Sequence, residues 1–182
     1  MIRRLSSVLL AATLGATSIP AQTVDIPVQS NVLSINPFGF LFEWYNIEYE
    51  RAFSSTASWS VGVGHIDIGD DNDRATYTSA DIKLRYYPSA EAPTKFSAGI
   101  SFGYSRVTDE DLPAGGGALI ENEFDALSVG IDLGYSWLLG RTRQFFIGTG
   151  IGAKRLFLLG EDDDDDETFG YPTVRLSIGY AF

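Results

Sequence analysis

From residue 58 onward, large apolar residues occupy every second position in six stretches of the sequence, with small or polar residues between them. Successive side chains of a β-strand point to opposite faces, so this period predicts strands with one apolar face. In the clearest stretch, 126–138, the apolar set is Leu127, Val129, Ile131, Leu133, Tyr135 and Trp137. The other five strands are expected around residues 59–64, 80–87, 96–105, 147–154 and 173–182.

Two further strands are expected before residue 58, at 31–36 and 46–53, with residues 37–42 turning between them. Pro37 cannot donate to a strand ladder, which places it at an edge or a turn. Single-chain bacterial membrane barrels have even numbers of strands, so these two segments count as separate strands. The sequence therefore predicts an all-β fold, an eight-stranded antiparallel transmembrane up-and-down β-barrel.

The sizes of the side chains on the two faces indicate which face points outward. An eight-stranded barrel has an interior just wide enough for its own side chains, which suits glycine, serine and a few charges. The bulky apolar face would then contact lipid. A soluble, ligand-carrying barrel is the alternative, and it requires the reverse arrangement, with apolar residues inside.

The N-terminus has the features of a secretory signal peptide, residues 1–21. Arg3 and Arg4 precede a short apolar run, 8–14, and Ile19-Pro20-Ala21 suits cleavage before Gln22. A membrane anchor is the alternative, but it needs about 20 apolar residues. We expect residues 22–30 to form a short periplasmic segment and residues 31–182 to form the barrel.

Composition excludes several classes of function. The chain has no cysteine, which removes disulfides, thiolate metal sites and cysteine nucleophiles. Its net charge of −11 makes nucleic acid an implausible partner. No later stretch is apolar enough for a membrane helix, so insertion into lipid would need strands.

The C-terminal strand carries a resemblance to known proteins. Its alternating residues resemble the terminal signal that the outer-membrane barrel assembly machinery recognises; they are Val174, Leu176, Ile178, Tyr180 and Phe182. The segments 36–42 and 46–52 are similar to the opening of small Gram-negative outer-membrane barrels of poorly defined function, related to the OmpA and OmpX barrels. The resemblance implies a monomer in the outer membrane, in contact with its lipids and lipopolysaccharide. Phe182 would lie on the periplasmic side, with periplasmic turns at 54–56, 88–94 and 139–144 and extracellular loops at 69–76, 108–124 and 159–168.

No catalytic residue, cofactor or metal site is predicted. His65 is the single histidine, and although it could act as a base with Asp67, a position at the membrane rim is the simpler interpretation. No serine lies in a recognisable nucleophile motif. One acidic loop could bind a cation weakly, although a solvated charge block is the default for such a run. Its residues are Glu161, Asp162, Asp163, Asp164, Asp165, Asp166 and Glu167.

The inward face of the expected barrel collects four acids and four bases: Glu48, Glu50, Asp81, Asp132, Lys83, Arg85, Lys154 and Arg175. Confined charges are costly unless paired, so we expect a neutralising network that plugs the lumen, with Lys83 and Arg85 meeting Glu48 and Glu50 across it. A bulge near Pro37 would instead turn both glutamates outward.

The sequence thus favours a non-enzymatic barrel with a structural or surface-interaction role. A small passive pore is one alternative, and a lipid-modifying enzyme is another.

Overall fold

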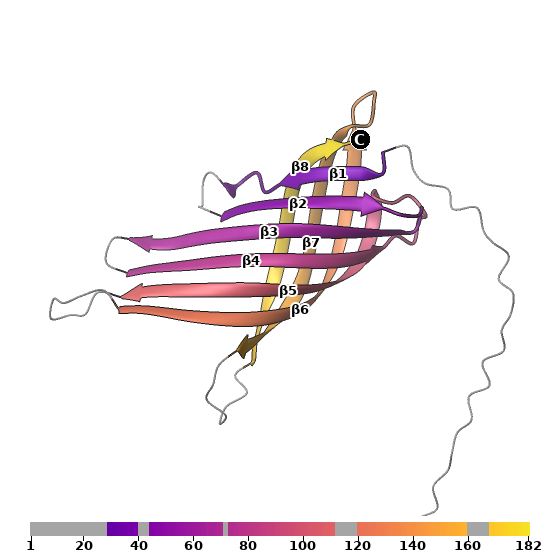
Figure 1. Ribbon diagram of the computed structural model, residues 1–182. Helices are drawn as coiled ribbons and strands as arrows, with labels where there is room; N and C mark the ends of the chain where they lie inside the picture. The colour runs from indigo at the N-terminus through magenta and orange to yellow at the C-terminus, as the bar shows by residue number, and fades with distance from the viewer. Residues whose placement is uncertain (1–28, 40–43, 71–72, 112–119, 160–167) are drawn as a thin grey trace, which may run out of the picture.

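The computed structural model describes residues 29–39, 44–70, 73–111, 120–159 and 168–182 (Figure 1). Its strands are β1 (Asn31–Ile35), β2 (Trp44–Ala52), β3 (Ala57–Asp70), β4 (Asp73–Tyr86), β5 (Lys95–Asp111), β6 (Ile120–Leu139), β7 (Phe145–Leu159) and β8 (Thr168–Ala181). They form a closed barrel in chain order, and each strand is antiparallel to both neighbours. The predicted eight-stranded antiparallel barrel is confirmed. In the described ranges, no helix is both long and apolar enough to cross a membrane.

The strand pairings define the stagger of the barrel. A line across the pairs that starts at Ile35 and crosses every strand reaches Thr168 on β8. Ile35 itself pairs with Ile178, ten residues further along β8. Such a stagger tilts the strands, and eight tilted strands enclose an interior that side chains can fill.

The two faces of the barrel differ as the alternation predicts. On the outside, Ile131, Ile151 and Val174 each leave about two thirds of the residue exposed, at 65%, 64% and 66%. On the inside, Ser97 and Ser105 are fully buried. The arrangement is the reverse of a soluble barrel, which buries its apolar residues.

Several strand boundaries differ from those predicted. β3 and β4 continue to Asp70 and from Asp73, so most of the expected loop at 69–76 is strand. The expected loops at 108–124 and 159–168 are likewise shortened by β5, β6, β7 and β8. The pattern failed there because the outward residues become polar beyond Tyr104, as at Arg106, while the backbone ladder continues. β2 also starts two residues earlier than expected, at Trp44, and β1 ends at Ile35.

We call the barrel end that holds Phe182 the C-terminal end and the opposite end the far end. Two small apolar clusters lie at the C-terminal end. Phe146 packs with Val32 and Ala181 in one of them. The other consists of Tyr87, Ala52 and Ala92, and Tyr87 follows directly after β4. These side chains close the interior at this end.

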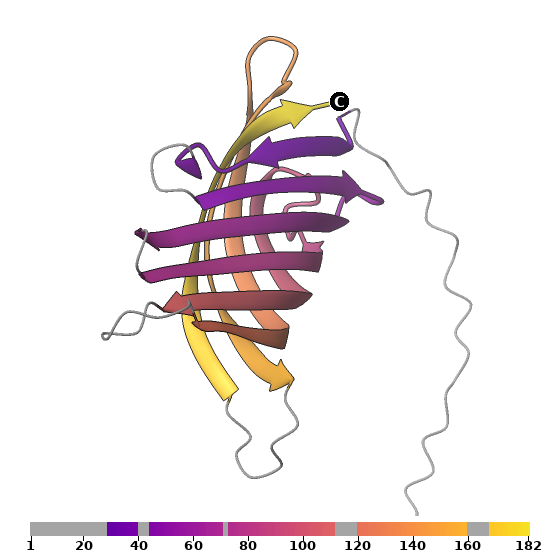
Figure 2. The same cartoon turned by 60° about the vertical axis from the view of Figure 1, so that its left-hand side comes forward.

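The seam between β1 and β8 is the shortest in the barrel wall. β1 pairs with β8 at four positions, from Val32–Ala181 to Ile35–Ile178, whereas β5 and β6 pair at seventeen. Pro37 follows shortly after Ile35 and cannot donate to a ladder, which explains why β1 stops. Within the described part of the chain, β8 has no paired strand on its β1 side between Thr168 and Ser177. Figure 2 shows the short β1 between β2 and β8.

Candidate functional site

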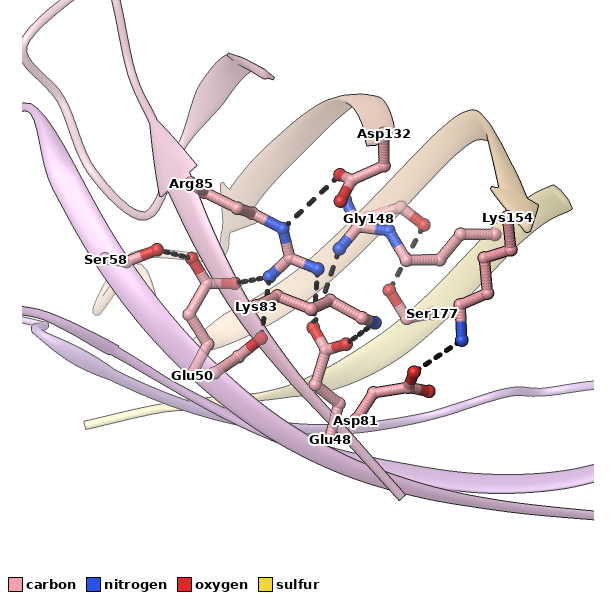
Figure 3. A network of polar contacts seen from close by, with 12 residues as sticks. Glu48, Glu50, Ser58, Asp81, Lys83, Arg85, Asp132, Gly148, Lys154 and Ser177 are labelled. Atoms are coloured by element: carbon pink, nitrogen blue, oxygen red, sulfur yellow. Dashed lines mark hydrogen bonds and ion pairs between the residues drawn. The ribbon is translucent and has the colours of Figure 1, made fainter. Parts of the chain in front are cut away.

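The eight charged residues singled out in the sequence all lie on the inner face of the barrel (Figure 3). They come from five strands: Glu48 and Glu50 from β2, Asp81, Lys83 and Arg85 from β4, Asp132 from β6, Lys154 from β7 and Arg175 from β8. No bulge turns the β2 glutamates outward, since both are buried, with 8% and 3% of their surface exposed.

Arg85 is the centre of this group. Its Nη1 donates to Oε2 of Glu50 at 2.7 Å, and its Nη2 lies 2.9 Å from Oε1 of Glu48. Its Nε faces Oδ2 of Asp132 at 3.6 Å. The glutamate contacts pass over β3, which lies between β2 and β4, and the Asp132 contact passes over β5, so Arg85 links β2 to β6 on the opposite side of the barrel. Three acids on two distant parts of the wall therefore share one fully enclosed guanidinium.

Glu50 is the most completely satisfied carboxylate of the group. Besides Arg85, it accepts hydrogen bonds from Ser58 Oγ at 2.6 Å and from the Tyr87 hydroxyl. Burial raises the pKa of Tyr87, which follows β4 outside the spanning strand, so its hydroxyl remains a donor. Sequence reasoning missed both partners. Their inward parity was visible, but neither carries a charge that would have pointed to Glu50.

Glu48 gathers three cations. Lys83 donates to its Oε2, while Oε1 faces Arg85 and, at 3.5 Å, Nη1 of Arg175. A separate ion pair lies closer to the far end, where Lys154 Nζ donates to Oδ1 of Asp81 at 2.6 Å.

A tyrosine pair crosses the lumen nearer the far end than these ion pairs. The Tyr77 hydroxyl from β4 lies 3.4 Å from that of Tyr171 on β8 and 2.8 Å from Ser105 Oγ. Sequence reasoning also missed these tyrosines. The strand period shows that a residue points inward, but it does not show that two inward tyrosines meet across the lumen.

Glycines make room for the charged side chains. Gly103 pairs directly with Asp81, Gly99 with Asp132, Gly130 with Lys154 and Gly150 with Arg175. A Cβ on Gly99 would lie 2.7 Å from Oδ1 of Asp132, and one on Gly103 would lie 2.3 Å from Oδ1 of Asp81. The long side chains thus lie over bare backbone on the neighbouring strand.

Comparison with known proteins adds little to this geometry. No protein-family model matches the sequence, and no curated protein matches it. Among solved structures, the crystal structure of the N-terminal β-barrel domain of Pseudomonas aeruginosa OprF is similar, with 13% sequence identity and a TM-score of 0.49. The similarity covers 85% of this chain and 98% of that chain.

The candidate base at His65 lies on the outer surface. Its Nδ1 is 3.0 Å from Thr78 Oγ1, and the neighbouring Asp67 carboxylate accepts hydrogen bonds from Arg74 instead. Arg74, expected in a loop, belongs to β4.

The remaining predicted residues fall into two groups. The alternating C-terminal residues from Val174 to Tyr180 lie on the outer face of β8, and Phe182 follows the strand; Val174, Tyr180 and Phe182 are exposed. The acidic run 161–167 and the signal segment 1–21 lie outside the described residues.

Proposed function

We propose that this chain is an outer-membrane β-barrel of a Gram-negative envelope, with a structural or surface-interaction role and no catalytic activity. The outer face supports this location, because its large apolar side chains are exposed all around the wall; such a surface suits lipid better than water. Aromatic residues gather near the C-terminal end, including Tyr86, Trp137 and Tyr180, as in the interfacial girdles of membrane barrels.

The contacts made by Arg85 are the main support for a closed lumen. Contacts to Glu48, Glu50 and Asp132 tie opposite walls together through a side chain that is 1% exposed. The apolar cluster of Val32 and Phe146 lies beyond them at the C-terminal end. An ion crossing the barrel would have to break several enclosed ion pairs, each of which is costly to leave uncompensated. A plugged barrel therefore fits this interior better than a passive pore.

The proposed location implies which molecules the barrel would contact. The apolar face would contact outer-membrane lipids, and the far end would meet lipopolysaccharide. The residues from Val174 to Phe182 would serve as the signal for the barrel assembly machinery, after export directed by residues 1–21. We propose a monomer, because β1 to β8 close into one barrel in which β1 pairs with both β2 and β8.

Conductance recording tests the proposal directly. Refolded protein that migrates as a heat-modifiable species should insert into planar bilayers without stable single-channel currents, while a large porin under the same conditions gives steps. Reproducible open-channel currents from the folded protein would instead establish the passive pore. Failure of the folded species to enter bilayers or vesicles at all would contradict the membrane location itself.

A further inference from the structure

Two exposed arginines near the far end of the barrel are paired with acids of the same chain. Arg74 on β4 contacts Asp67, and Arg106 on β5 lies 2.7 Å from Glu123 and 2.9 Å from Asp125. The charge of these two side chains is therefore already compensated by neighbouring carboxylates. They offer little attraction to an anion from outside the protein.

Three exposed arginines at the C-terminal end have no such partner. Arg51 lies near the end of β2, and Arg141 and Arg143 lie in the turn between β6 and β7. In the part of the chain that the structure describes, none of the three lies within 4.0 Å of an acidic side chain or of the chain's terminal carboxylate. The C-terminal end thus presents uncompensated positive charge on a chain whose net charge is −11.

Arg51 lies on the outer wall among aromatic side chains. It is directly opposite Trp59 on β3, and Tyr49, on the same face of β2, packs edge-on against Trp59 with ring centroids 5.6 Å apart. Tyrosine and tryptophan rings of membrane proteins mark the level of the lipid headgroups. A guanidinium among them lies at the depth of the lipid phosphates, and its planar fork of donors matches phosphate oxygens.

The turn between β6 and β7 presents the other two arginines on the opposite side of the barrel, because β2 and β6 are four strands apart in a closed circuit of eight. Trp137 and Phe145 are exposed on either side of this turn, at 43% and 49%, so Arg141 and Arg143 lie just beyond the apolar surface. Arg143 has a positive φ of 54°, which glycine or asparagine adopts more readily. The backbone of the turn therefore does not explain an arginine at this position.

We propose that the rim of the C-terminal end binds the headgroups of anionic phospholipids, with Arg51 on one side and Arg141 and Arg143 on the other as phosphate ligands. The inference rests on the proposed outer-membrane location, in which this end lies in the leaflet that faces the periplasm. Arginines on opposite sides of a barrel cannot share one small ligand, whereas a leaflet surrounds the barrel and reaches both. One arginine near an anionic bilayer surface corresponds to about a fivefold preference.

Quenching of tryptophan fluorescence by brominated lipids tests both sides of the rim. The chain has three tryptophans. Trp44→Phe with Trp137→Phe leaves Trp59 opposite Arg51, and Trp44→Phe with Trp59→Phe leaves Trp137 just before the β6–β7 turn. Each folded protein is placed in vesicles of phosphatidylcholine and phosphatidylglycerol in which one lipid or the other is brominated. Next to both reporters, phosphatidylglycerol should be favoured by about fivefold at low salt.

Variants assign the preference to individual arginines. Arg51→Gln should abolish the preference at Trp59 and leave it unchanged at Trp137. Arg141→Gln together with Arg143→Gln should do the reverse, because the two groups lie on opposite sides of the barrel. A preference at Trp59 that survives Arg51→Gln, or one at Trp137 that survives the double variant, would overturn the proposal.

A matched control and a salt series complete the test. Arg74→Gln, at an arginine already paired with Asp67, should change neither preference. If a rim variant does not fold, the wild-type reporters decide. Their preference should disappear in about 1 M salt, because exposed charges are screened. A preference that is unchanged in high salt would overturn the role of the arginines.

The remaining outcomes separate the lipid from other anions and from the membrane location itself. Inorganic phosphate added at constant ionic strength should leave the preference intact, and its removal by phosphate would overturn the lipid as ligand. Equal quenching by both brominated lipids would overturn the headgroup site while leaving the membrane location in place. Absence of quenching by either lipid would contradict the membrane location.

Discussion

Replacing Arg85 with alanine should destabilise the barrel strongly. The wild-type side chain is 1% exposed and lies 2.7 Å from Glu50 and 2.9 Å from Glu48. After Arg85→Ala, Glu48 still contacts Lys83, but Glu50 keeps only hydrogen bonds from Ser58 and Tyr87 among the described residues. Removing one partner of a buried ion pair costs about 3–5 kcal/mol, so we expect a loss of free energy of unfolding of that size.

Reversible urea unfolding in lipid vesicles, followed by tryptophan fluorescence, would measure the loss. Arg74→Ala is the matched control, because this arginine is on the same strand but half exposed, and its pair with Asp67 should contribute little. Adding Glu50→Gln to Arg85→Ala removes the uncompensated charge and should recover about 0.5–3 kcal/mol. Equal stability of Arg85→Ala and Arg74→Ala, or no recovery in the double variant, would refute the argument that Glu50 depends on Arg85.

Three further predictions concern the outer face, the C-terminus and the acidic run 161–167. Ile131→Arg, at a residue 65% exposed to the proposed lipid, should cost about 2–4 kcal/mol in the same unfolding assay, with Ile131→Leu nearly neutral; a tolerated arginine would mean that this face does not meet lipid. Deleting Phe182 should lower the amount of heat-modifiable folded protein in membrane fractions without changing export, and unchanged assembly would count against the terminal signal. Replacing Asp162–Asp166 with serine and glycine should leave the unfolding midpoint unchanged in divalent-free buffer, because a solvated charge block buries no apolar surface; saturable calcium binding at micromolar concentration would show instead that the run is a cation site.

The alternation of large apolar and small residues was sufficient to predict the strands where one face of the wall is exposed and apolar and the other faces the lumen. From Leu127 to Trp137, lipid-sized side chains alternate with glycine, serine and Asp132, and β6 follows this alternation residue by residue. Toward the far end the contrast disappears, because outward residues such as Arg106 are polar while inward Val107 is apolar. The backbone ladder does not depend on that contrast, so the strands continue where the pattern stops.

The candidate site was partly predictable for the same reason. Parity alone places Glu48, Glu50, Lys83 and Arg85 on one face, and charge then suggests that they pair. Which carboxylate faces which base depends on the stagger of the barrel. The stagger is the sum of the registers between all eight strands, so the alternation within one strand does not reveal it. The hydrogen bonds from Ser58 and Tyr87 depend further on rotamers, which sequence reasoning does not reach.

The pairing of charges with glycines offers a signal that the strand period lacks. Residues directly opposite each other on adjacent strands have side chains in contact, and six of the eight inward charges lie opposite a glycine on at least one neighbouring strand. Lys154 lies opposite Gly130, and a slip of two residues along β6 would put it opposite Ser128 or Asp132. Such a slip preserves the inward and outward faces completely, so parity cannot exclude it, whereas loss of the glycine beneath the lysine side chain counts against it. Matching Lys154 to Gly130 and Asp132 to Gly152 would therefore favour the observed register of β6 and β7, whereas Glu50 and Lys83, which lie opposite Ser60, carry no such signal.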